Sequence, residues 1–164
     1  MIGKVLIVDD VSTNRIVFKV KLTAAGYQTL MAADGASCLA QARAEQPDLI
    51  LLDFALPDGD AAQVLRDLRS DPRTQGIPVV VFSADPDPER RLISLKAGAD
   101  DFLAKPIDDQ TLLARLRNLL RAKVETDHEL VGLAEGAERA PGYPALSAAI
   151  KAGSRLAIWL SERI

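Results

Sequence analysis

Residues 78–83 read Pro-Val-Val-Val-Phe-Ser, and this stretch indicates the class of fold. Its apolar residues 79–82 follow one another without polar alternation, so both faces of the predicted strand are expected to be buried. Strands buried on both faces are typical of parallel sheets that carry helices on each side. A helical pattern from about Pro88 to Ala97, followed by Gly98, agrees with that arrangement.

Strands and helices alternate on both sides of this stretch. Short apolar runs predict four further strands, and a helical pattern follows each strand. This alternation predicts right-handed crossovers and an α/β fold, a doubly wound five-stranded parallel sheet of the flavodoxin-like kind with strand order 2-1-3-4-5. The five predicted strands are Lys4–Val8, Gln28–Ala32, Leu49–Asp53, Pro78–Ser83 and Asp101–Ala104.

The predicted helices show caps and apolar faces. Asp34, Asp60 and Asp108 each stand where a helix is expected to begin, and aspartate is a favoured capping residue. Gly26 ends the first helix. The expected apolar faces are Ile16, Val17, Val20 and Ala24 in the first helix, Val64, Leu65 and Leu68 in the third, and Leu112, Leu113, Leu116, Leu119 and Leu120 in the last.

Composition narrows the classes of protein. The chain has 164 residues, 48% of them hydrophobic, which suits one domain with an extension. A net charge of −3 and a pI near 5.2 create no field that would attract nucleic acid or an anionic membrane, so neither is expected as a partner. The single cysteine, Cys38, is expected to be a buried free thiol. With no signal segment and no membrane-spanning run, a soluble cytoplasmic protein is predicted.

Three segments are expected along the chain. Residues 1–123 form the domain, 124–153 extend the last helix and then make a linker, and 154–164 are either the start of a following domain or a terminal helix. The linker is predicted at 136–144, where Gly and Pro occur with Ala and charged residues. A short helix is predicted at 145–152.

Polar residues stand where the predicted strands end. The first strand is followed by Asp9 and Asp10, the third ends in Asp53, the fourth in Ser83, and the fifth is followed by Lys105. Because the carboxyl ends of parallel strands meet in one crevice, these side chains are expected to lie together. Three crowded carboxylates repel one another unless a cation neutralises them, and oxygen ligands favour Mg²⁺.

These residue types predict a phosphoacceptor site. Asp10 and Asp53 are expected to bind Mg²⁺ directly, with the backbone carbonyl of Ala55 as a third ligand and Asp9 acting through water. Asp53 is the expected nucleophile, because a carboxylate can form an aspartyl phosphate when cations neutralise the transferring oxygens. Lys105 supplies an ammonium group and Ser83 a hydroxyl donor. The isomer of the bond between Lys105 and Pro106 is expected to aim that ammonium group.

The residues at these positions resemble the receiver domains of two-component response regulators over residues 1 to about 123. Further motifs are similar to those of the first receiver of diguanylate cyclases of the PleD type, notably Asp71-Pro72 and the run from Lys105 to Asp109. The motifs that carry the family resemblance are Val8-Asp9-Asp10, Leu51-Leu52-Asp53, Leu56-Pro57, Phe82-Ser83-Ala84 and Phe102-Leu103-Ala104-Lys105-Pro106.

The resemblance implies a function and partners. A histidine kinase or a histidine phosphotransfer protein would phosphorylate Asp53 with Mg²⁺, Ser83 would move toward the phosphoryl group, and the ring of Phe102 would turn inward behind it. A downstream diguanylate cyclase, absent from this chain, is one output that it implies. Members of this type form homodimers through the fourth helix, fifth strand and fifth helix, where this chain offers Arg91, Lys96, Asp100, Asp101, Arg115 and Arg117.

Two positions are expected to set the lifetime of the phosphate. The methyl group of Ala55 cannot orient a water molecule, whereas the carboxylate of Asp85, two residues beyond Ser83, could repel or position one. The loop after Asp53 departs from the family pattern, because Ala61 stands where glycine is usual, and this puts the backbone shape of the loop in question.

Three alternatives remain open at this point. A phosphatase of the haloacid dehalogenase type also uses an aspartate nucleophile with Mg²⁺, but it requires a second aspartate where Ala55 stands. A flavodoxin-like cofactor binder would present a phosphate loop after the first strand, where Asp9 and Asp10 would repel the phosphate. A receiver that is not phosphorylated and acts only as an interaction platform is the third. The expected protein is a phosphoacceptor rather than an enzyme with its own substrate.

Overall fold

The structure is a computed structural model, and it describes residues 2–85 and 87–139. Five strands form a parallel sheet in the order β2-β1-β3-β6-β7, which confirms the predicted 2-1-3-4-5 order of the main strands. Two short strands pair as a separate hairpin between β3 and the next helix. The strands are β1 Lys4–Val8, β2 Gln28–Ala32, β3 Leu49–Asp53, β4 Ala55–Leu56, β5 Gly59–Asp60, β6 Val79–Ser83 and β7 Asp101–Ala104.

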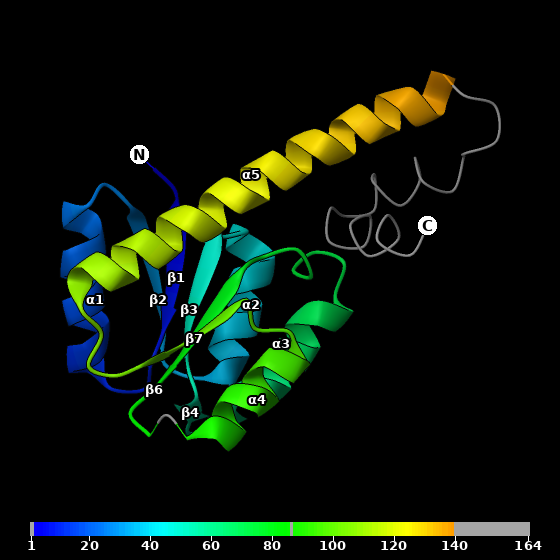
Figure 1. The fold of residues 1–164 in the computed structure, drawn as a ribbon. Coiled ribbons are helices and arrows are strands. Elements are labelled where there is room, and N and C mark those ends of the chain that lie inside the picture. Colours follow the sequence, from blue (N-terminus) through cyan, green and yellow to red (C-terminus); the bar gives the residue numbers. More distant parts are fainter. Residues whose placement is uncertain (1, 86, 140–164) are drawn as a thin grey trace.

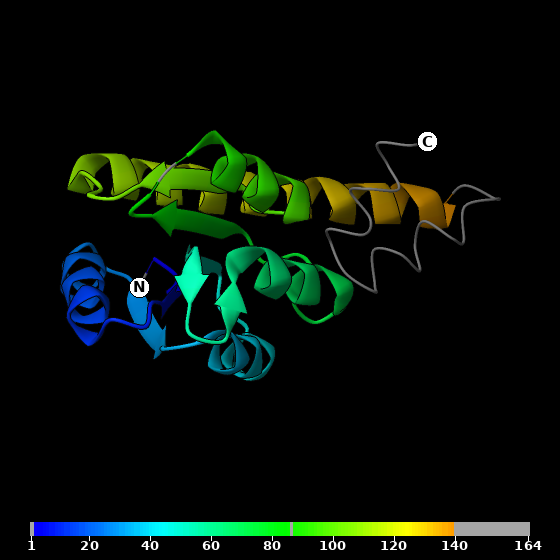
Figure 2. The same ribbon diagram turned by 90° about the horizontal axis from the view of Figure 1, so that it is seen from below.

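Helices cover both faces of the sheet (Figures 1 and 2). Aspartates fix where three of them begin: the carboxylates of Asp34, Asp60 and Asp87 accept hydrogen bonds from the backbone N–H groups three residues further on. The carboxylate of Asp108 accepts a hydrogen bond from the backbone N–H of Thr111 at the start of the last helix. The helices are α1 Ser12–Ala24, α2 Gly35–Glu45, α3 Ala61–Ser70, α4 Pro88–Ala97 and α5 Asp109–Arg139.

The sheet separates two hydrophobic cores. Alternate residues of each strand point to opposite faces, so β6 sends Val79 and Val81 to one core and Val80 and Phe82 to the other. The first core includes buried residues of α2 and α3, and the second includes those of α1 and α5. Both faces of the strand predicted from residues 79–82 are therefore buried, as expected.

The apolar face predicted for the first helix does not pack on the sheet. Ile16 is 56% exposed and Val20 63% exposed, and Val17 and Ala24 are also exposed. Phe18 and Leu22 are the buried residues of α1, and the Phe18 ring lies 5.1 Å from the ring of Phe82. The prediction was wrong because a second apolar pair at helical spacing, which includes an aromatic ring, fills the space against the sheet.

The last helix packs as predicted and continues further. Leu112 and Leu116 are fully buried, and Leu113, Leu119 and Leu120 pack against the same core. The backbone of α5 remains helical through Gly132 to Arg139, so the first part of the predicted linker, 136–139, is helical. Figure 1 shows α5 extending beyond the sheet. The predicted helix at 145–152 and the segment 154–164 lie outside the described residues. Within the described residues, no helix is long and apolar enough to cross a membrane.

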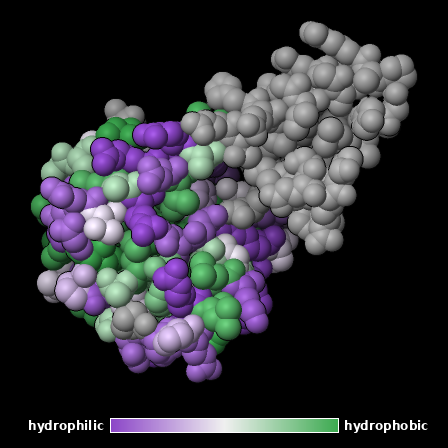
Figure 3. Space-filling view, viewed as in Figure 1, coloured by the Kyte–Doolittle hydropathy of each residue, from purple (hydrophilic) through white to green (hydrophobic). Residues whose placement is uncertain are grey.

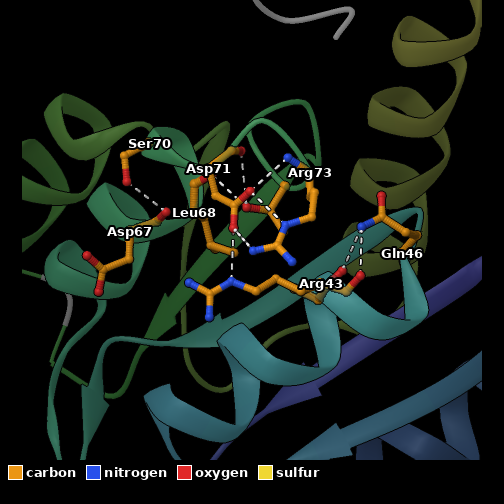
Figure 4. Close-up of polar contacts among 9 residues, drawn as sticks. Arg43, Gln46, Asp67, Leu68, Ser70, Asp71 and Arg73 are labelled. Atoms are coloured by element: carbon orange, nitrogen blue, oxygen red, sulfur yellow. Dashed lines mark hydrogen bonds and ion pairs between the residues drawn. The ribbon is translucent and has the colours of Figure 1, made fainter. Parts of the chain in front are cut away.

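Two polar clusters join α3 and the loop after it to neighbouring elements. Asp71 lies between Arg43 of α2 and Arg73, with an N–O distance of 2.9 Å to each (Figure 4). These hydrogen bonds lower the pKa of Asp71. The guanidinium group of Arg69 donates to the backbone carbonyls of Gly98, Gln75 and Ile77 and to the carboxylate of Asp100. Arg69 therefore ties α3 to the loops that precede β6 and β7.

Candidate functional site

The carboxyl ends of four parallel strands bring the predicted polar residues to one edge of the sheet. Asp9 follows β1, Asp53 ends β3, Ser83 ends β6 and Lys105 follows β7. The strand register sets their neighbours, because Asp53 pairs with Phe82 and Ser83 pairs with Ala104. The structure therefore brings together side chains that are up to 96 positions apart in the sequence.

Three carboxylates form the centre of the site. Asp9, Asp10 and Asp53 each offer one oxygen atom, and these atoms all lie within 4.8 Å of one another. Asp9 is fully buried and Asp53 is 7% exposed, whereas Asp10 is exposed. Such a group of hard oxygen ligands, open on one side, has the chemistry of a site for Mg²⁺.

Lys105 extends over the two buried carboxylates. Its Nζ lies 3.2 Å from Oδ2 of Asp9 and 3.2 Å from Oδ2 of Asp53, and 4.8 Å from the centroid of the Phe82 ring. The peptide bond between Lys105 and Pro106 is cis. The ammonium group thus places a positive charge where a group transferred to Asp53 would carry negative charge.

Asp9 is held by the start of α1. Its Oδ1 accepts the backbone N–H of Val11 at 2.9 Å, and its Oδ2 accepts Nδ2 of Asn14 at 3.2 Å. Arg15 donates from Nη1 to the Asp9 carbonyl at 2.6 Å. Asn14 and Arg15 were not identified from the sequence. Their position in the first turn of the helix that follows two aspartates is the signal that could have indicated them.

Without a metal ion, the negative charge of Asp53 lowers the stability of the fold. Burial raises the pKa of Asp53, the ammonium of Lys105 lowers it, and the neighbouring Asp9 carboxylate raises it, so that the pKa lies above its ordinary value. The folded protein therefore binds this proton more tightly than the unfolded chain does. As the pH rises from about 3.9 through the raised pKa, Asp53 lowers the stability of the fold, and above that pKa the loss is complete.

Asp53→Asn is therefore expected to stabilise the metal-free protein. We expect the free energy of unfolding in EDTA at pH 7 to increase by about 1 kcal/mol, because the substitution removes a charge that burial and the neighbouring Asp9 carboxylate both disfavour. Urea denaturation would measure it, with Glu89→Gln as an exposed control. The gain should vanish near pH 3, at about the lower limit of carboxyl titration. A loss of stability at pH 7, or a gain that does not depend on pH, would contradict this expectation.

The Ser83 hydroxyl is buried and points into the loop that follows β6. Its Oγ lies 3.0 Å from the carbonyl oxygen of Asp85 and 3.1 Å from the backbone nitrogen of Asp85. Nη1 of Arg90, in the first turn of α4, donates to the same Oγ at 3.2 Å. The carboxylate of Asp85 is exposed, and its effect on the lifetime of the phosphate stays a prediction. Arg90 was not identified from the sequence.

Phe102 and Ala55 are two further residues that the sequence predicts to act at the site. The ring of Phe102 is already buried in the core that contains α2 and α3, so no inward turn is needed to bury it in this structure. Ala55 is exposed in β4, and its backbone N–H lowers the pKa of Asp53 by hydrogen bonding to the carboxylate. The use of the Ala55 carbonyl as a metal ligand stays a prediction.

The loop after Asp53 has Ala61 where the resemblance led us to expect glycine, and hydrogen bonds hold its backbone. Ala61 is buried, and its backbone N–H donates to the carbonyl of Phe54 at 2.9 Å. Gly59 takes the positive φ of 147° that a side chain would disfavour. The carboxylate of Asp58 accepts the backbone N–H groups of Gly35 and Ala36, at 2.9 and 3.1 Å, which lowers its pKa. These contacts tie the loop to the start of α2.

The six residues expected on a dimer face have different surroundings. Oδ2 of Asp100 lies 3.0 Å from Nη2 of Arg69 in α3. Oδ2 of Asp101 forms an ion pair within the chain with Nη1 of Arg115, at 3.1 Å. Lys96 lines a groove between α3 and α4, and Arg117 lines a pocket with Tyr27 next to the end of α1. The structure therefore does not bring all six together as one free charged surface. Arg91 is exposed on α4.

With this geometry established, comparison with known proteins defines the class. A model of the response regulator receiver domain matches residues 5–117, a range that contains the carboxylates, Ser83 and Lys105. The chain belongs to the response regulator receiver family, as the resemblance predicted. A second model, for the ubiquinone biosynthesis protein COQ7, matches residues 90–161, which is less than half of the chain. The first part of that range forms α4, β7 and α5 of the receiver fold.

Particular relatives are regulators. The response regulator PleD of Caulobacter vibrioides is 44% identical over 127 residues, which are 77% of this chain and 28% of PleD. The DNA-binding dual master transcriptional regulator RpaA of Synechocystis is 41% identical over 118 residues, 72% of this chain and 49% of RpaA. The chain therefore spans less than half of the length of either curated relative.

Solved receiver structures have the same fold. A response regulator from Chloroflexus aurantiacus has a TM-score of 0.70 and 34% identity, covering 73% of this chain and 98% of that one. The chemotaxis response regulator CheY4 of Vibrio cholerae has a TM-score of 0.68 and 29% identity, covering 73% and 99%. The family assignment disfavours the phosphatase and the flavodoxin-like cofactor binder as alternatives.

Proposed function

We propose that Asp53 accepts a phosphoryl group and that this event changes the state of the receiver. The observation that carries the proposal is the position of the Lys105 ammonium group, 3.2 Å from the carboxylates of both Asp9 and Asp53. Only one of these carboxylates ends a central strand next to Ser83, which can donate a hydrogen bond to a phosphoryl oxygen. Asp53 is therefore the acceptor and Lys105 the neutralising charge.

The chain's residues would divide the work of transfer. An oxygen of Asp53 attacks phosphorus and forms a new oxygen–phosphorus bond. The bond from phosphorus to a ring nitrogen of the donor's histidine breaks. That nitrogen takes up a proton, so a neutral imidazole leaves. Lys105 stabilises the negative oxygens during this exchange, and the buried surroundings of Asp53 exclude water. Deprotonated Asp53 is required, which Lys105 favours by lowering the pKa of Asp53.

The carboxylates fit Mg²⁺, the metal of receiver domains. Asp10 and Asp53 would bind it directly, with the Ala55 carbonyl as a third ligand and Asp9 acting through water. The three carboxylate oxygens that lie within 4.8 Å of one another support this fit. Burial and the Asp9 carboxylate also raise the pKa of Asp53 in spite of the Lys105 ammonium group, so a further cation would favour its charged form. When bound, the ion neutralises charge on the transferring phosphoryl oxygens.

Partners of the receiver are part of the proposal. A histidine kinase or a histidine phosphotransfer protein is the proposed donor, and the exposed apolar side chains of α1, which begins close after Asp9, offer it a surface. A homodimer through α4, β7 and α5 is supported by apolar side chains that reach the surface on α4, where Leu92 is 53% exposed and Ile93 and Leu95 are also exposed. Figure 3 shows hydrophobic surface on this face of the molecule. We place the protein in the cytoplasm, where the buried free thiol of Cys38 is typical.

Phosphorylation by a small donor tests the central claim. Incubation with acetyl phosphate and Mg²⁺ is expected to add the mass of one phosphoryl group to the wild-type protein, measured by intact mass spectrometry. Asp53→Asn and a wild-type sample in EDTA should gain none, whereas Glu89→Gln, which removes an exposed carboxylate of α4, should be labelled like wild type. A wild-type protein that gains no phosphoryl group would remove the proposed function and favour a receiver that serves only as an interaction platform.

A further inference from the structure

Arg90 lies next to Ser83 and Phe54, outside the carboxylate cluster. Its Nη1 donates to Ser83 Oγ at 3.2 Å, and its Cζ lies 4.8 Å from the centroid of the ring of Phe54, the residue that follows Asp53. Nη2 lies 3.9 Å from Oδ2 of Asp85, and Nε lies 3.7 Å from Oδ2 of Asp87. Four interactions therefore hold a long side chain that is 32% exposed.

The start of α4 explains why the guanidinium group reaches Ser83. The carboxylate of Asp87 caps the helix by accepting the backbone N–H of Arg90 at 2.7 Å, and Pro88 begins the helix. Arg90 therefore stands in the first turn, and side chains of a helix lean toward its amino-terminal end. In α4 that end faces the loop that leaves β6, where Ser83 lies.

The hydroxyl of Ser83 has no free hydrogen-bonding capacity in this arrangement. A serine hydroxyl can donate one hydrogen bond and accept two. Ser83 donates to the carbonyl of Asp85 at 3.0 Å, and it accepts from the Asp85 backbone N–H at 3.1 Å and from Arg90 at 3.2 Å. Before Ser83 can donate to a phosphoryl oxygen on Asp53, it must give up at least the first of these bonds.

We propose that Arg90 is a positioning residue that holds the Ser83 hydroxyl in the orientation of the unphosphorylated protein. The proposal rests on the function proposed for Asp53. When a phosphoryl group is present, the hydroxyl proton turns from the Asp85 carbonyl toward the phosphoryl oxygen, and the bond from Arg90 is broken as the oxygen moves. Arg90 thereby opposes the active orientation of Ser83, and it sets how much phosphorylation is needed to switch the receiver.

The contacts of Arg90 favour this restraining role over direct binding of the phosphoryl group. Its charge faces the carboxylates of Asp85 and Asp87, and its Cζ lies over the ring of Phe54. Each of these contacts would have to be broken before the group could turn toward Asp53. Lys105 already supplies a cation at hydrogen-bond distance from Asp53.

Beryllofluoride, which mimics a phosphoryl group on aspartate, gives a direct measurement. We expect Arg90→Met to bind beryllofluoride about three- to tenfold more tightly than wild type at saturating Mg²⁺ in calorimetric titrations, because one charge-assisted hydrogen bond no longer opposes the active orientation. The affinity for Mg²⁺ alone should not change. Arg90→Ala must shift the affinity in the same direction, and Arg66→Met, which removes an exposed arginine of α3, should bind like wild type.

A double-mutant cycle separates positioning from general effects on folding. If Arg90 acts through the hydroxyl, Arg90→Met should have no effect on beryllofluoride binding in a Ser83→Ala background. Equal or weaker binding by Arg90→Met, or an effect that persists without the Ser83 hydroxyl, would overturn the proposal while leaving the function of Asp53 intact. Failure of the wild-type protein to bind beryllofluoride with Mg²⁺ would overturn both.

Discussion

Lys105→Met is expected to lower the initial rate at which acetyl phosphate phosphorylates Asp53 by about a hundredfold or more. The ammonium group lies 3.2 Å from the Asp53 carboxylate, in a place where a buried charge acts strongly on the transferring oxygens. Methionine keeps most of the length and the contact with the Phe82 ring but removes the charge. Removing the charge also leaves two buried carboxylates without this partner, which further favours the protonated, unreactive form of Asp53.

Time-resolved intact mass spectrometry would measure this rate. Lys19→Met, which removes an exposed lysine of α1, is the matched control and should be phosphorylated like wild type. Thermal denaturation of both variants checks that the fold is intact. Phosphorylation of Lys105→Met within a few-fold of the wild-type rate would show that this ammonium group is not the charge that supports transfer.

Arg69→Met is expected to lower the free energy of unfolding by about 3 kcal/mol, the largest effect on stability that we expect from a polar residue outside the site. The guanidinium group donates to three backbone carbonyls and forms an ion pair with Asp100 at 3.0 Å. Asp100 also accepts the backbone N–H of Val79, where β6 begins. Methionine would leave partly buried carbonyls and a carboxylate without this donor.

Urea denaturation followed by circular dichroism would measure the loss. Arg66→Met is a close control, because Arg66 lies one turn earlier on the same helix, is exposed, and donates to the side chain of Gln63. It should change stability by no more than about 0.5 kcal/mol. If the two variants lost the same small amount, the Arg69 cluster would not be a major connection between α3 and the start of β6.

Strand positions and the site were predictable because each rests on a local signal. Residues 79–82 are apolar throughout and form a central strand, and polar residues such as Asp53 and Ser83 stand where strands end. Parallel topology then brings those ends to one edge, so the composition of the site follows from the order of elements. The caps at Asp34 and Asp60 were predictable for the same local reason.

Features that depend on three-dimensional packing were not predictable. The exposed face of α1 and the buried pair Phe18 and Leu22 are both apolar at helical spacing, and only the shape of the sheet decides which of them packs. Arg90 resembles any other charged residue on a helix until the start of α4 places it beside Ser83. Likewise, no sequence pattern shows that Asp58 binds the start of α2.

The ring of Phe82 has a consequence for how faithfully the site keeps its shape. The same ring contacts Phe18, which anchors α1 to the sheet, and the ammonium group of Lys105. Thermal fluctuations that loosen α1 are therefore expected to displace the ammonium group of Lys105, which lies 3.2 Å from the Asp53 carboxylate. The position of this ammonium group thus depends on the aromatic contact behind it. Heat or mild denaturant that loosens the packing of Phe18 on Phe82 should therefore increase the motion of the Lys105 ammonium group before the protein unfolds.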